Sequence, residues 1–154
     1  MKSSLNNKTV QLYANVGILA IIAGGLLAGF SAKHPTTFPV WASAYLVLVV
    51  GVLQVGFGRG LQRLASGASQ TAALWAFAVY NIGNLLVILG TALKYAGTPT
   101  PSIIAGGGTL LVVAMLLLCY AIRNAEKSRI RTGFYIIVAI VIVSMPIGLV
   151  LARQ

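Results

Sequence analysis

Acidic residues are almost absent from this chain. Its 154 residues hold one acid, Glu126, against 11 Lys and Arg, which gives a formal charge of +10. Paired-carboxylate hydrolysis, Ser-His-Asp catalysis and carboxylate metal sites need acids that the sequence does not supply. Glu126 lies in a charged stretch between apolar segments, so no carboxylate is available for a proton relay inside a membrane.

Cysteine and histidine are equally scarce, with one copy of each, Cys119 and His34. A single Cys excludes an internal disulfide, and one Cys with one His is too few for a zinc site. We interpret Cys119, in a Leu-rich run, as a small core residue and His34 as a solvent-exposed loop residue. We therefore expect no metal, no cofactor and no enzymatic activity supplied by this chain alone.

Charged residues of either sign are rare in this chain, and apolar residues are abundant. Charged residues make up 8% of the chain, where a soluble domain carries about 25%. Apolar residues make up 58%, and they are gathered in runs long enough to cross a bilayer, which takes about 20 residues. The sequence predicts an all-α polytopic integral membrane protein, with residues 1–154 forming a single transmembrane helical domain.

Five apolar segments predict a bundle of five transmembrane helices. We expect Pro39 to disfavour helix before it, and Gly56, Gly58 and Gly60 to loosen the end of the second helix. Pro146 lies inside the last segment and is expected to kink it. The predicted spans are about 10–32, 40–58, 71–95, 103–122 and 132–152.

The cations are unevenly divided between the two sides that five spans create. Eight of them fall in the N-terminus and in the connections after the second and fourth spans, and three fall on the other side. The positive-inside rule then predicts a cytoplasmic N-terminus and a C-terminus outside. We expect the membrane to be a bacterial cytoplasmic (inner) membrane. Anionic lipids at the cytoplasmic face, rather than nucleic acid, are the expected contacts of four cations, Arg123, Lys127, Arg129 and Arg131.

The third segment carries Tyr80, Asn81 and Asn84 at mid-depth, where an unpaired amide costs several kcal/mol. Gln54 and Asn15 are further amides in apolar segments. Such groups either hydrogen-bond between helices, line a polar path or hold the head group of a ligand. With Tyr80 as an anchor, a quinone-like ligand between helices is one form of the last alternative.

Small residues recur at spacings that favour close helix packing. Ala76, Gly83 and Gly90 are seven apart in the third segment, and Gly25 and Gly29 form a GxxxG pattern in the first. Such stripes offer more packing faces than one small bundle needs, which indicates a homo-oligomer or a membrane-protein partner. We expect a non-catalytic accessory or assembly subunit of a larger membrane complex. The alternative is a small oligomeric transporter or channel for a neutral or anionic solute.

Overall fold

The computed structural model describes residues 5–151, without the side chains of 145–151, and all its elements are helices. A π-helical segment, Leu46–Val52, joins α2 (Thr37–Tyr45) to α3 (Leu53–Arg63), so that Thr37–Arg63 forms one continuous helix. A short 3₁₀ turn, Ala65–Gly67, follows it. The α-helices are α1 Asn7–Ser31, α2 Thr37–Tyr45, α3 Leu53–Arg63, α4 Gln70–Tyr95, α5 Pro101–Ala121 and α6 Arg129–Leu151.

Within the described residues, four helices are long and apolar enough to cross a membrane: Asn7–Ser31, Thr37–Arg63, Gln70–Tyr95 and Pro101–Ala121. The predicted all-α, membrane-like class is therefore confirmed at this level. The fifth predicted span corresponds to α6, whose side chains are described only as far as Ser144. Its crossing of the membrane stays a prediction.

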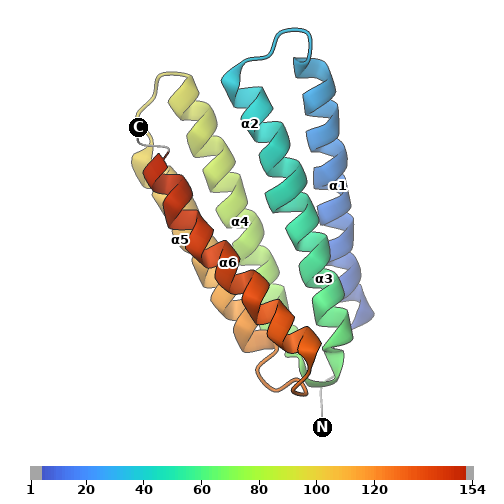
Figure 1. The fold of residues 1–154 in the computed structure, drawn as a ribbon. Coiled ribbons are helices and arrows are strands. Elements are labelled where there is room, and N and C mark those ends of the chain that lie inside the picture. The colour runs from blue at the N-terminus through green and yellow to red at the C-terminus, as the bar shows by residue number, and fades with distance from the viewer. Residues whose placement is uncertain (1–4, 152–154) are drawn as a thin grey trace.

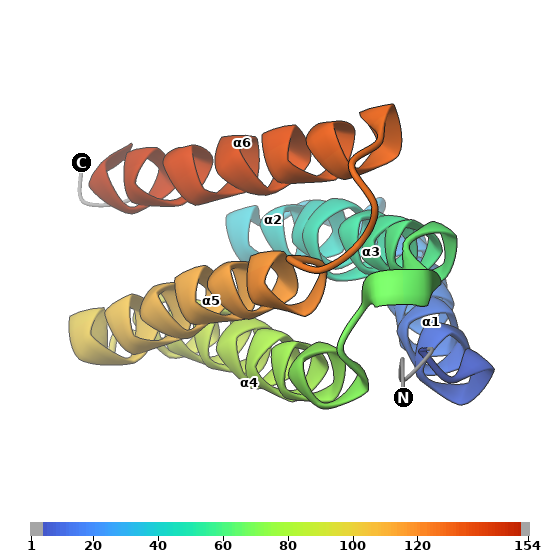
Figure 2. The same ribbon diagram turned by 90° about the horizontal axis from the view of Figure 1, so that it is seen from below.

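The helices run alternately up and down and form two hairpins with a last helix laid over them (Figure 1). In the first hairpin α1 packs along α2–α3, and in the second α4 packs along α5. Helix α6 contacts both α5 and α3, and it covers the side where the two hairpins meet (Figure 2). Connections 64–69 and 122–128 share one end of the bundle, and connections 32–36 and 96–100 share the other.

The second span is longer at both ends than the predicted 40–58. It begins at Thr37, because Pro39 falls in the first turn, where a backbone N–H has no intrahelical partner to lose. It ends at Arg63, because its glycines do not end the helix. They instead allow side chains of other helices to pack closely against its backbone. A Cβ at Gly58 would lie 2.9 Å from the Cβ of Tyr13, and one at Gly60 would lie 2.5 Å from the ring of Phe134.

Polar caps start two other helices earlier than predicted. Asn6 Oδ1 accepts a hydrogen bond from the Lys8 N–H at 3.0 Å, and α1 begins at Asn7. Ser128 Oγ accepts one from the Arg131 N–H at 3.3 Å, and α6 begins at Arg129. Each cap satisfies an orphan donor of the first turn and extends the helix into polar sequence. The kink predicted at Pro146 falls where side chains lie outside the described residues.

Each hairpin contains one crossing at which two glycines touch. A Cβ at Gly17 would lie 2.9 Å from the carbonyl oxygen of Gly51, and one at Gly51 would lie 3.0 Å from that of Gly17. In the second hairpin Gly83 and Gly107 are related in the same way, with distances of 3.0 and 2.8 Å. Backbones approach this closely only where no side chain intervenes, so these glycines set the spacing within each hairpin.

The predicted small-residue stripe of the third span is confirmed, because Gly83 and Gly90 both face α5. The GxxxG pattern of the first span makes no close contact with the rest of the described structure. A Cβ at Gly25 or Gly29 would meet nothing within 4 Å, and Gly17 and Gly24 make the close contacts of α1 instead.

Adjacent glycines on α5 give a direct test of this packing. Gly107→Ala should lower the free energy of unfolding by about 1–3 kcal/mol, the usual cost of overpacking. The added Cβ would lie 2.8 Å from the Gly83 carbonyl oxygen and 2.9 Å from the Val87 nitrogen, and neither backbone atom can move freely. Gly106→Ala is the control, since a Cβ there meets nothing and gains helix propensity. Detergent unfolding titrations measure both, and equal stability of the two variants would contradict the assigned crossing.

Candidate functional site at the seam between the hairpins

Three tyrosine hydroxyls form hydrogen bonds between the first hairpin and α4. Tyr13 donates a hydrogen bond to the Ala73 carbonyl at 2.8 Å, and Tyr45 donates one to Asn84 Oδ1 at 2.8 Å. Tyr80, from α4, donates to the carbonyl of Val49 in the π-helical segment. A hydroxyl buried in hydrocarbon must find a protein partner, so these bonds fix how the hairpins meet. We call this contact the tyrosine seam.

Aromatic rings fill the space around these hydroxyls. The rings of Tyr13 and Phe77 meet edge-to-face with centroids 5.1 Å apart. Phe57 lies 5.8 Å from Tyr80, also edge-to-face, and 5.8 Å from Phe134 of α6. Tyr13 and Tyr80 are each 1% exposed. The seam is therefore the packed centre of the molecule, where α1, α3, α4 and α6 meet.

At the end of the bundle that holds connection 64–69, the Gln70 side-chain amide links α4 to the start of α1. Gln70 Oε1 accepts from the backbone N–H of Asn6 at 2.9 Å, and Gln70 Nε2 donates to Thr9 Oγ1. The start of α1 is thereby tied to the start of α4. The Leu5 N–H adds a bond to the Ala65 carbonyl at 3.3 Å.

Asn81 and Asn84 of the candidate polar site make different hydrogen bonds. Asn84 is 2% exposed, and its amide both accepts from Tyr45 and donates to the Tyr80 carbonyl at 2.9 Å. Asn81 is half-buried and donates to the Phe77 carbonyl of its own helix at 2.8 Å. Asn84 therefore belongs to the seam, while Asn81 satisfies its amide locally beside it.

Gln54 is the exception among these amides. Its side chain is fully buried on α3, yet neither Oε1 nor Nε2 has a hydrogen-bond partner among the described residues. It shares a buried stripe with Val50, Phe57 and Leu61, at helical spacing. Burying an unpaired amide costs about 1–3 kcal/mol by protein mutational data. Buried polar groups are nearly always paired, so Gln54 is an exception within the described bundle.

The backbone beside Gln54 departs from regular α-helix. In the Leu46–Val52 segment the turns are wider, and the N–H of Leu53 bonds to the Leu48 carbonyl five residues earlier. Wide turns of this kind occur frequently at functional sites. The segment reads as a continuous Leu/Val run with one glycine, so its sequence gave no signal of the widening.

Sequence reasoning missed Tyr13 and Tyr45 as seam residues. The available signal was their position, because both fall inside an apolar run where a hydroxyl needs a partner. Asn15, in contrast, was predicted as part of a polar intramembrane site, but it is exposed on α1 and lies outside the seam.

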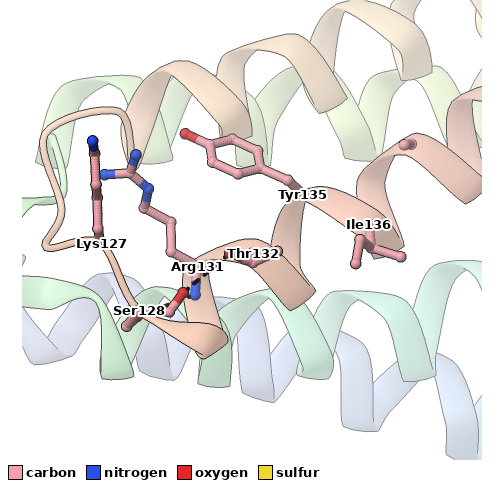
Figure 3. A pocket seen from close by; sticks show the side chains of 7 residues that line it. Lys127, Ser128, Arg131, Thr132, Tyr135 and Ile136 are labelled. Atoms are coloured by element: carbon pink, nitrogen blue, oxygen red, sulfur yellow. Dashed lines mark hydrogen bonds between the residues drawn. The ribbon is translucent and has the colours of Figure 1, made fainter.

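The four cations predicted to contact lipid separate into two groups. Lys127 and Arg131 line a cavity of about 470 Å³ at the start of α6 (Figure 3). Arg123 places its guanidinium 3.5 Å from the ring centroid of Tyr120, away from that cavity. Arg129 is exposed and does not line the cavity either.

Metal-ligating side chains do not gather in the part of the chain that the structure describes, where no three His, Cys, Asp or Glu residues lie together. His34 is exposed in connection 32–36, and Cys119 is partly buried near the far end of α5. The two therefore lie toward opposite ends of the bundle and do not form a Cys–His pair.

Comparison with known proteins gives no relative for this chain. No protein-family model, no curated protein and no solved structure matches it. Its function is therefore inferred from its own residues and their geometry.

Proposed function

We propose that this chain is a non-catalytic integral membrane protein that acts as an accessory or assembly subunit of a larger membrane complex. The observation that carries the proposal is that the polar groups of the tyrosine seam are occupied by hydrogen bonds within the bundle. Tyr13, Tyr45, Tyr80 and Asn84 all bond to other parts of the bundle. Groups engaged in holding helices together are not available to replace the hydration shell of a passing solute.

The outer surface supports the same proposal. The face of α1 that turns away from the bundle carries large exposed apolar side chains, with Leu19 and Leu26 each more than half exposed. Gly25 and Gly29 lie open among them. Lipid tails are as apolar as these side chains, so a protein partner is favoured mainly where small residues allow a close approach.

The proposed setting is a bacterial inner membrane with the N-terminus of the chain in the cytoplasm. Arg59 and Arg63 close the second span at the same end of the bundle as Lys8, and the charged 122–128 connection lies there too. Lys33 and Lys94 lie toward the other end. An excess of cations at one end is the usual mark of the cytoplasmic side.

A conduit for a neutral or anionic solute is the second candidate, and Gln54 is the observation that favours it. A fully buried amide with two unpartnered atoms could contact a solute or a water inside the bundle. Its place beside the wide turns of Leu46–Val52 is compatible with that use.

Solute flux separates the two candidates. The purified chain in liposomes should pass neither small neutral solutes such as glycerol nor anions such as chloride above the rate of empty liposomes. Flux that appears with the wild-type chain and is lost in Gln54→Leu, while Gln62→Leu retains it, would contradict the accessory role. Gln62 is a matched control because it is an exposed amide on the same helix.

A further inference from the structure

The cavity at the start of α6 has a polar mouth. Lys127 and Arg131 bring two cations to it, and Ser128 and Thr132 bring two hydroxyls. Figure 3 shows Lys127 and Arg131 gathered on one side of the helix start. The Thr132 hydroxyl donates to the Ser128 carbonyl at 3.3 Å, whereas the Ser128 hydroxyl only accepts, from the Arg131 N–H. Two cations with one hydroxyl donor form the kind of group that recognises a phosphate.

The other end of the cavity is largely apolar. Tyr135 and Ile136 line it further along α6 (Figure 3), and Ala139 lines it one turn beyond them. From Ser128 to Ala139 the helix rises about 16 Å at 1.5 Å per residue. The cavity thus changes from charged to apolar as it passes from the end of the bundle toward mid-depth, and a phospholipid has the same order of phosphate and acyl chain.

The two cations of the mouth have no acidic counterpart within the described chain. Glu126 is the one acid, and neither Lys127 nor Arg131 forms an ion pair among the described residues. Arg131 Nη1 donates to the Ala125 carbonyl, and its guanidinium lies 5.8 Å from the ring centroid of Tyr135. These contacts hold the guanidinium at the cavity, and a guanidinium has five N–H donors in all.

We propose that this cavity binds one anionic phospholipid. Its phosphate is held by Lys127 and Arg131 with the Ser128 hydroxyl, and one acyl chain follows Tyr135 and Ile136 toward Ala139. This is a site for a single molecule, which differs from a diffuse attraction of basic residues to an acidic membrane surface. It does not depend on whether the chain is an accessory subunit or a conduit.

The chain supplies a matched control, because Arg123 and Arg129 lie in the same segment outside the cavity. The full chain is reconstituted with a phosphatidylglycerol and phosphatidylcholine mixture and re-extracted at about 0.5 M NaCl, where diffuse attraction is screened. Lipid mass spectrometry then counts the lipid that each chain retains. Lys127→Gln with Arg131→Gln should lower retained phosphatidylglycerol about tenfold, and Arg123→Gln with Arg129→Gln should change it less than about twofold.

A second arm separates a phospholipid from free phosphate. Ala139→Trp fills the apolar end of the cavity and should lower phosphatidylglycerol retention, and inorganic phosphate should not displace the lipid. Circular dichroism confirms that each variant keeps its helices. Equal losses in the two charge variants, no retained lipid in the wild-type chain, no effect of Ala139→Trp, or displacement by inorganic phosphate would each overturn the proposal.

Discussion

Tyr80→Ala should lower the free energy of unfolding by about 3–5 kcal/mol, the range seen when large buried aromatic residues are truncated. The ring of Tyr80 is 1% exposed and packs edge-to-face on Phe57. Its hydroxyl also satisfies the Val49 carbonyl across the seam. Truncation removes both contributions at the point where the two hairpins meet, so the loss should be large. Unfolding in mixed micelles, followed by loss of helix signal, measures it.

Two further variants show how much of this loss comes from the hydroxyl and whether it is specific to the seam. Tyr80→Phe keeps the ring and removes one interhelical hydrogen bond, so it should cost about 0.6–1.7 kcal/mol. Tyr120→Ala is the control, because Tyr120 is exposed on the surface of α5. If Tyr80→Ala were no more harmful than Tyr120→Ala, the seam would not be the contact that holds the hairpins together.

Gln54→Leu should raise the free energy of unfolding by about 1–3 kcal/mol, which is the opposite sign to most core substitutions. Leu has a similar volume and places no polar atom in the site. The two unpartnered atoms of Gln54 are then no longer buried without hydrogen bonds. The gain should appear in the same micelle titration as a shift of the unfolding midpoint to higher denaturant.

Gln62→Leu controls for the general effect of added apolar surface, since Gln62 is exposed on the same helix. A gain confined to Gln54→Leu would locate the cost at the buried amide. A clear loss of stability in Gln54→Leu would mean that the amide has a partner in the membrane, such as a bound water or solute. That result would favour the conduit over the accessory subunit.

The helices could be predicted because hydropathy records directly which segments suit a bilayer. The predicted bounds agree within a few residues except for the second span, where Gly58 and Gly60 were interpreted as the end of the helix. Glycine weakens a helix in isolation, but it also lets Tyr13 and Phe134 approach the backbone closely. Which effect prevails depends on the neighbours, and one sequence does not specify them.

Helix pairing could be predicted only in part. Spacing showed that Gly25 and Gly29 could pack closely, and the structure uses Gly17 and Gly24 instead. Helix α1 is apolar nearly all round, so its composition does not indicate which face turns inward. The same limit applies to the seam, where Asn84 was recognised as costly to bury but its partner Tyr45, 39 residues away, was not.

The positions of the cations could also be predicted only in part. Sequence predicted that Arg123, Lys127, Arg129 and Arg131 would face anionic lipid. It could not separate the two that line a cavity from the two that do not, because that depends on where α6 begins and how its first turn is oriented.

The most direct test of the accessory role is the mass of the particle that contains this chain when it is extracted from its native membrane in mild detergent. We predict a particle much heavier than the 16.1 kDa chain, with larger membrane subunits present in fixed ratio by mass spectrometry. A particle that contains only copies of this chain, at any oligomeric state, would contradict the proposal.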